Sequence, residues 1–254
     1  MNAIMFYPEV YEIARFNKKR KEFPPFGVLY LAAVLENIGI KVNIQKITTE
    51  SNVFDLKDFD IILYSLSSSC TYNMMLESRR ISFIKNNSII ITGGIHASIY
   101  PKQTLLDFQC DATVLGEGEE TLPKVIYSIV NKIYEPILGV IYNMNIYNMN
   151  IHNYNLSMTN PIKDLDSLPF PARHLIPQED FIFNDRLSRK NLKMTHILAS
   201  RGCPYSCYFC GGLNKKHRYR SSQSIFNELK MLNEQYNIEG FVINDENFII
   251  NEKK

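Results

Sequence analysis

Three cysteines gathered near the end of the sequence are the residues with the clearest chemistry. They lie in the stretch Arg201-Gly-Cys-Pro-Tyr-Ser-Cys-Tyr-Phe-Cys-Gly-Gly212 and form a C-x3-C-x2-C array. Thiolates at this spacing can bind three irons of one 4Fe–4S cube, and no further cysteine follows in the sequence. Clusters that only transfer electrons normally have four cysteine ligands. Cys203, Cys207 and Cys210 therefore predict a cluster whose fourth iron is open to a substrate or cofactor.

Two other interpretations of these cysteines are a zinc site and ordinary buried thiols. Structural zinc takes four ligands, commonly from two closely spaced pairs of residues. His217 is available as a fourth ligand, but it follows Cys210 at a spacing that matches no common zinc pattern. Cys70 and Cys110 stand alone in the sequence, and we interpret both as structural.

The array resembles the signature of the radical S-adenosylmethionine (SAM) enzymes, whose usual form is C-x3-C-x-aromatic-C. Phe209 supplies the aromatic residue before the last cysteine. The resemblance implies SAM as a cofactor, bound to the open iron through its amino and carboxylate groups. It also implies that one electron from the cluster cleaves SAM to a 5′-deoxyadenosyl radical.

Composition excludes several other classes of protein. The 254 residues are 45% hydrophobic and 21% charged, as in an ordinary globular protein. The net charge is +2 and the basic residues are scattered, which argues against nucleic acid as a partner. The run Lys18-Lys-Arg-Lys21 is interpreted as a solvated loop. No apolar stretch approaches the roughly 20 residues that span a bilayer. Five cysteines, three of them clustered, favour a reducing cytoplasm.

The first part of the chain alternates strand-like and helix-like segments. Strands are predicted at residues 3–7, 41–45, 59–64, 88–92 and 112–115, and helices at 26–38, 71–86 and 119–132. Such β-α-β alternation is typical of a parallel sheet covered by helices on both faces. Residues 1–137 therefore predict a Rossmann-like, doubly wound α/β domain.

Small and polar residues follow several of these strands. Ligands on doubly wound sheets bind outside the carboxyl ends of the strands, where small residues let a ligand approach the backbone. An alternative for any single loop is a tight turn and nothing more. The residues in question are Ser65 and Ser67, Gly93, Gly94 and His96, and Gly116, Glu117 and Gly118.

Three segments of this domain resemble the cobalamin-binding domain that precedes the radical SAM domain in one large subfamily. They are residues 24–35, 91–96 and 115–122, and the joining segment 161–173 resembles the linker of that subfamily. The resemblance implies that the eight strand-end residues contact cobalamin. Better-known cobalamin domains place a cobalt-binding histidine after the first strand, but residues 7–15 contain none. For His96 a surface or hydrogen-bonding role is an equal alternative.

Residues 138–190 are predicted to link two domains. The segment 138–142 is predicted as an edge strand, and three near-copies of one pentapeptide follow in residues 141–155. Four prolines between Pro161 and Pro177 are expected to keep the chain extended over the surface.

Residues 191–254 resemble the start of the partial TIM barrel of radical SAM enzymes. Strands are predicted at 193–200 and 240–244, with a helix at 222–236 between them. Catalytic groups in such barrels lie at the carboxyl ends of strands. By resemblance, Asp245 and Glu246 lie near SAM, with capping of a helix as the alternative, and Arg218 to Ser221 lie near the cluster. Because a full barrel needs about 250 residues, we expect a fragment or a truncated product.

The sequence therefore predicts a radical SAM enzyme with a 4Fe–4S cluster, SAM and cobalamin as cofactors. A small-molecule substrate and an electron donor such as flavodoxin or ferredoxin are the expected partners. Methyl transfer to an unactivated carbon and oxidative cyclisation are both outcomes that the resemblance implies, and no catalytic residue is assigned beyond the cluster ligands. Two alternatives stay open: a radical SAM enzyme that no longer binds cobalamin, and a non-catalytic remnant.

Overall fold

The structure is a computed structural model that describes most of the 254 residues. The described residues are 1–9, 24–48, 53–67, 69–84, 87–143, 157–184, 191–210, 216–248 and 250. The predictions for the first-strand loop beyond residue 9, for the basic run at 18–21, for most of the pentapeptide repeat and for the side chain of Cys70 lie outside them. Within them, no helix is long and apolar enough to cross a membrane.

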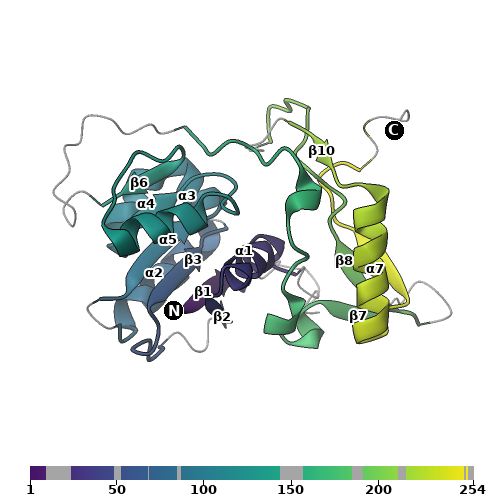
Figure 1. The fold of residues 1–254 in the computed structure, drawn as a ribbon, viewed down its shortest axis with the longest axis horizontal. Helices are drawn as coiled ribbons and strands as arrows, with labels where there is room; N and C mark the ends of the chain where they lie inside the picture. The colour runs from purple at the N-terminus through teal and green to yellow at the C-terminus, as the bar shows by residue number, and fades with distance from the viewer. Residues whose placement is uncertain are drawn as a thin grey trace.

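Six strands form the first sheet, at the left of Figure 1. Its order is β2-β1-β3-β4-β5-β6, with every neighbouring pair parallel except the antiparallel β5 and β6. The strands are β1 (Asn2–Pro8), β2 (Lys41–Ile47), β3 (Ile61–Ser65), β4 (Ile89–Gly93), β5 (Ala112–Val114) and β6 (Val140–Tyr142). This arrangement confirms the predicted doubly wound α/β fold.

Helices cover both faces of this sheet because the strands are apolar on both sides. In β1, Ala3 and Met5 belong to one buried cluster, whereas Ile4 and Phe6 belong to the other. The first cluster is closed by α1 (Phe26–Asn37) and α5 (Leu122–Asn131), and the second by α2 (Ser69–Ile81), α3 (Ile95–Ile99) and α4 (Pro101–Phe108). Helices α3 and α4 were not predicted, since the short segments between β4 and β5 show little helical periodicity.

A second, smaller sheet lies at the right of Figure 1, with strand order β11-β8-β7. Strand β8 (Lys193–Ile197), helix α7 (Ser222–Tyr236) and strand β11 (Gly240–Ile243) form the predicted β-α-β unit, in which the two strands are parallel. The Ser221 side chain caps α7 by accepting a hydrogen bond from the Ser224 amide at 3.1 Å. A two-stranded ladder joins β9 (Ser200–Arg201) to β10 (Arg218–Tyr219).

The predicted linker is largely part of these two bodies. Strand β6 belongs to the first sheet, and β7 (Ile182–Asn184) belongs to the second. The segment from Pro161 does not lie extended over the surface as predicted, because Ile162, Leu165 and Arg173 are all at least 95% buried. It forms three short 3-10 turns, η2 (Leu165–Ser167), η3 (Arg173–Leu175) and η4 (Gln178–Asp180).

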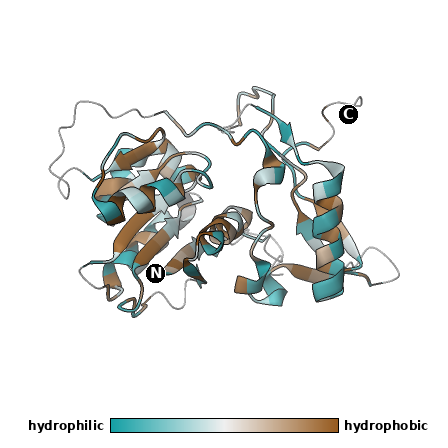
Figure 2. Ribbon diagram, in the orientation of Figure 1, coloured by the Kyte–Doolittle hydropathy of each residue, from teal (hydrophilic) through white to brown (hydrophobic). Residues whose placement is uncertain are grey.

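Helix α1 serves both bodies. Val28, Ala32 and Leu35 face the first sheet, whereas Leu29 lies in the core of the second body, with Ile197 and Leu232. The Leu29 carbonyl also accepts a hydrogen bond from the Ala172 amide at 3.1 Å. Figure 2 shows the helix hydrophobic over much of its surface, as two-sided burial requires. The packing of α1 thus holds the two bodies together.

Candidate functional site

A hollow opens at the carboxyl ends of β3, β4 and β5. Its cavity volume is about 60 Å³, within a space of about 440 Å³ that includes open solvent. The strand order reverses between β1 and β3, and this switch point is where doubly wound sheets bind ligands. Most of the residues that line the hollow are apolar. The full set is Met5, Leu31, Leu63, Tyr64, Ser65, Ile91, Thr92, Gly93, Gly94, Val114, Gly116, Gly118 and Leu122.

Five of the eight residues predicted to contact cobalamin line this hollow, and three do not. Those that line it are Ser65, Gly93, Gly94, Gly116 and Gly118. Ser67 is exposed outside the hollow. His96 lies on α3, where its ring packs against those of Tyr72 and Tyr100, with centroids 4.3 and 5.2 Å away. Desolvation lowers the pKa of His96 and favours the neutral imidazole. His96 therefore packs against aromatic rings outside the hollow and does not line it.

Two of the lining glycines are required by the protein itself. Gly94 has a φ of +95°, and a Cβ there would lie 2.6 Å from the Leu66 carbonyl oxygen. Gly116 has a φ of +87°, and its Cβ would lie 2.7 Å from Thr159 Oγ1. Both positions therefore favour glycine whether or not a ligand binds. For Gly94 and Gly116, turn geometry and close packing explain the residue, so close approach of a ligand is not needed.

Glu117 points away from the hollow and toward the second body. Its carboxylate accepts two hydrogen bonds from Arg218, at 2.6 and 2.8 Å, and one from the Ile162 amide at 2.9 Å. Burial by itself would raise the pKa of Glu117, but these hydrogen bonds outweigh it and hold the pKa below its ordinary value. The described position thus assigns Glu117 to an interdomain contact and not to the wall of the hollow.

A second ion pair lies beside the first. Arg201 Nη1 is 2.7 Å from Glu119 Oε1, and the Arg201 guanidinium lies over the Tyr30 ring at 4.7 Å. Glu119 is only 5% exposed. Burial opposes the charge of Arg201, yet the neighbouring Glu119 carboxylate raises its pKa above the ordinary value. Two of the four charged side chains come from the loop after β5, and two from the residues that flank the cysteines.

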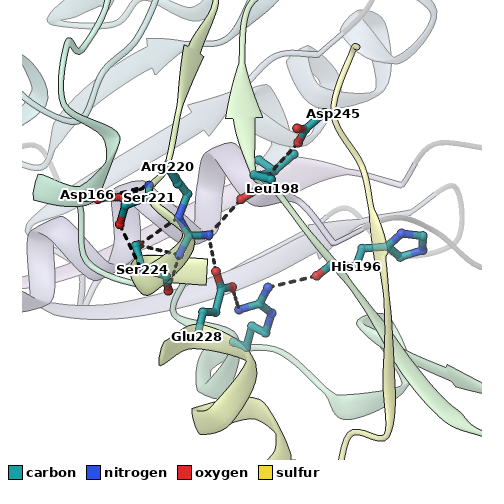
Figure 3. A network of polar contacts seen from close by, with 10 residues as sticks. Asp166, His196, Leu198, Arg220, Ser221, Ser224, Glu228 and Asp245 are labelled. Carbon is teal, nitrogen blue, oxygen red and sulfur yellow. Dashed lines mark hydrogen bonds and ion pairs between the residues drawn. The ribbon is translucent and has the colours of Figure 1, made fainter. Parts of the chain in front are cut away.

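A buried carboxylate on α7 binds two arginines, a feature that sequence reasoning missed. Glu228 is fully buried and pairs with Arg173 at 2.6 Å and with Arg220. Figure 3 shows Arg220 also reaching Ser224 and the Leu198 carbonyl, which accepts at 2.9 Å. One signal was available: Glu228 stands between Ile225 and Leu229 on the predicted apolar face of the helix. A charge at such a position implies a buried partner.

The cysteines lie on the loop that leaves β9. Cys203 is half-buried, Cys207 and Cys210 are exposed, and all three thiols are free. The Cys210 amide donates to the Cys207 carbonyl at 3.1 Å. Three accessible thiols are the type and number of ligand that the predicted iron–sulfur cluster requires. However, no three His, Cys, Asp or Glu side chains of the described residues gather closely enough to hold a metal ion. Cys110, by contrast, is fully buried beside Thr92 and Thr113, consistent with a structural role.

Asp245 supports the strand end that precedes the cysteine loop. Its carboxylate accepts from the Ala199 amide at 2.8 Å and from the Ser200 hydroxyl at 2.6 Å. Neither predicted role, contact with SAM or capping of a helix, is needed to explain these bonds. Glu246 is exposed. The His217 ring packs against Tyr219, and Nε2 lies 3.1 Å from the Asn247 carbonyl oxygen.

Comparison with known sequences points to the same part of the chain as the hollow. Residues 16–126 match the B12-binding domain family. An uncharacterised methyltransferase of Pyrococcus horikoshii is 27% identical over 91% of this chain and 50% of its own length. The cytidylyl-2-hydroxyethylphosphonate methyltransferase of Streptomyces wedmorensis is 25% identical over 88% of this chain and 51% of its own. The chain thus spans about half the length of these curated relatives.

Two solved structures share the fold along nearly the whole chain. One is TsrM of Kitasatospora setae, a radical SAM methyltransferase with cobalamin and a 4Fe–4S cluster bound (TM-score 0.61, 15% identity, 96% of this chain and 47% of that one). The other is OxsB, a cobalamin-dependent SAM radical enzyme (TM-score 0.65, 19% identity, 98% and 34%). Residues 16–126 thus match a B12-binding domain, and nearly the whole chain shares its fold with these two enzymes.

Proposed function

We propose that this chain is the cofactor-binding portion of an enzyme that transfers a methyl group to a carbon atom of a small-molecule substrate. In this proposal the hollow after β3, β4 and β5 binds part of cobalamin, and Cys203, Cys207 and Cys210 bind a 4Fe–4S cluster. The observation that carries the proposal is a contact between the hollow and the cysteine loop. Arg201, which precedes the cysteine loop, is paired with Glu119, which lies in the same loop as the lining residues Gly116 and Gly118.

The walls of the hollow suit one part of a large ligand. They are mainly apolar, they stand beside the switch point of the sheet, and four glycines are among the lining residues. A ligand as large as cobalamin would fill the hollow with one arm and leave the rest outside. That exposed remainder would face the second body, where the cysteine loop begins.

The sequence relatives include both methyltransferases and cyclases, and those of higher identity favour methyl transfer. Two curated relatives at 27% and 25% identity are methyltransferases. When bound, the cluster with SAM supplies radical chemistry at carbon, and cobalamin supplies a methyl group. The chain's own contribution is to hold the two sites at a fixed separation. An electron donor such as flavodoxin or ferredoxin would reduce the cluster, and Glu246, in the segment after β11, is the proposed acidic contact to SAM.

Anaerobic reconstitution with iron and sulfide tests the cluster. The wild-type chain should gain about four irons, the number in a 4Fe–4S cube, with a broad visible absorption and an EPR signal after reduction. Cys207→Ala should lose most of the iron, while Cys110→Ala, which changes a buried thiol away from the loop, should keep it. Equal iron in the wild type and Cys207→Ala would contradict the assignment.

Equilibrium dialysis against cyanocobalamin tests the second cofactor. The proposal expects saturable binding to the cluster-free chain, with one site per chain. Iron binding without cobalamin binding would instead favour a radical SAM protein that does not use cobalamin. Failure of both would leave neither cofactor assignment standing.

A further inference from the structure

The loop formed by residues 116–119 has two sides. Gly116 and Gly118 line the hollow, whereas the carboxylates of Glu117 and Glu119 face the second body and pair with arginines. Adjacent residues of one short loop therefore contact two different parts of the molecule.

The two arginines stand at the base of the cysteine loop. Arg201 and Arg218 are direct partners in the antiparallel ladder of β9 and β10, so they close the segment 202–217 that contains all three cysteines. Their side chains then continue to Glu119 and Glu117 at 2.7 and 2.6 Å. Both ends of the cysteine loop are thus held by the loop that lines the hollow.

The surroundings make these contacts specific. Arg218 binds Glu117 with two nitrogen atoms and also donates to the Ile162 carbonyl at 2.6 Å, which fixes the plane of the guanidinium. The side chains of Arg218 and Glu119 are 9% and 4% exposed. Buried ion pairs add little net stability compared with apolar residues, because both charges lose water. What such pairs supply is a defined geometry.

We propose that Arg201 and Arg218 are positioning residues that hold the cysteine loop against the cobalamin hollow, with Glu119 and Glu117 as their anchors. The proposal rests on the proposed function for the identity of the two sites. The structural part of the proposal does not depend on the ligands. Removal of the Glu117 or Glu119 charge should free the base of the cysteine loop while the cores of the two bodies stay folded.

Limited trypsin digestion of the cofactor-free chain, followed by mass spectrometry, measures how readily the base of the cysteine loop opens. Trypsin cleaves after arginine, so Arg201 and Arg218 are themselves the reporters. In Glu117→Gln and Glu119→Gln, cleavage after these two arginines should be about fivefold faster or more. Alkylation of Cys203 by iodoacetamide should rise in the same variants, whereas Cys110 should stay unlabelled as long as the first core is intact.

Lys46→Met is the matched control. Lys46 pairs with Asp180 at 2.9 Å, so it also joins the two bodies, and both side chains are partly buried. This pair lies apart from residues 116–119 and from the cysteines in sequence. The control should leave cleavage at Arg201 and Arg218 unchanged. Equal acceleration in all three variants would overturn the proposal and indicate general loosening, and no acceleration in either anchor variant would overturn it as well.

A last measurement separates positioning from simple stability. Cyanocobalamin should slow cleavage after Arg218 in the wild type, because the bound ligand would contact the other side of the loop that holds Arg218. This protection should be lost in Glu117→Gln. Bound cyanocobalamin without any protection of wild-type Arg218 would overturn the link to the hollow. If cyanocobalamin does not bind the wild type, the cobalamin part of the proposed function fails, and the ligand-free digestion still decides the role of the arginines.

Discussion

Arg173 and Glu228 lie 2.6 Å apart, Nη1 to Oε1, although 55 residues separate them in the sequence and each side chain is only 1% exposed. Arg173 comes from the predicted linker and Glu228 from the first barrel-type helix. The pair therefore fixes the linker to the second body. Arg173 also lies over the Phe26 ring of α1 at 5.5 Å, which extends the contact to the helix that both bodies share.

Loss of the Glu228 charge should destabilise the chain strongly. Glu228→Gln leaves two buried arginines facing a neutral group, and uncompensated buried charges cost about 3–5 kcal/mol. Urea unfolding followed by circular dichroism measures the change. Glu234→Gln on the same helix is the control, because its partner Lys230 and Glu234 itself are each 61% exposed. An exposed pair of this kind contributes about 0.2–1 kcal/mol, so similar losses in the two variants would contradict the assignment.

The contact between Glu117 and Arg218 should be lost in acid. The pKa of Glu117 is lowered in the folded chain from an ordinary value of 4.5, so folding favours its ionised form. A group with a depressed folded pKa stabilises the fold above its unfolded pKa, and this contribution disappears as the pH falls through the folded value. The difference in unfolding free energy between wild type and Glu117→Gln should be constant from about pH 5 to pH 7 and shrink below about pH 4. A difference that grows in acid would have the wrong sign.

The four cysteines whose side chains the structure describes should divide into two classes by reactivity. Burial raises the pKa of Cys110 to about 11, although hydrogen bonds with Thr92 and Thr113 act in the opposite direction. Only about one thousandth of this thiol is ionised at about pH 8, and the thiolate is the reactive form. In the cluster-free chain iodoacetamide should label Cys203, Cys207 and Cys210 at least about a hundredfold faster than Cys110. Labelling of Cys110 in urea shows that its sulfur reacts once exposed.

The sequence predicted the arrangement of local elements well. Apolar segments placed the five parallel strands within two residues of their observed ends. The four inner strands are largely apolar because they are buried on both faces, whereas the edge strand β2 alternates between buried and exposed residues. The helix at 222–236 matched its observed bounds, with Ser221 as the cap and Asn237 in a left-handed conformation at its end. These features are set by residues near one another in the chain.

Contacts between distant residues were not predictable in the same way. Glu117 carries no local sign that its partner is Arg218, which lies 101 residues away. The prolines of the linker predicted an extended chain over the surface, and local pattern does not reveal that Arg173 is buried and paired with Glu228. The glycines at the strand ends were attributed together to a ligand, with a tight turn as the alternative for any single loop. For Gly94 the positive φ and the nearby Leu66 backbone agree with that alternative. Partner identity depends on the folded chain, so it had to come from the structure.

Filling the hollow from its own wall should block cobalamin without unfolding the domain. A Cβ at Gly118 would lie 3.2 Å from Leu31 Cδ2 and 3.9 Å from Val114 Cγ1, and both neighbours line the hollow. Gly118 lacks the positive φ of Gly94 and Gly116, so Gly118→Val adds bulk with little backbone strain. The cyanocobalamin Kd should rise about tenfold or more, equivalent to about 1.4 kcal/mol. Gly27→Ala on α1 is the control, because no atom lies within 4 Å of its new Cβ, and it should bind like the wild type. Unchanged binding in Gly118→Val, with the fold confirmed by circular dichroism, would show that cobalamin does not enter the hollow.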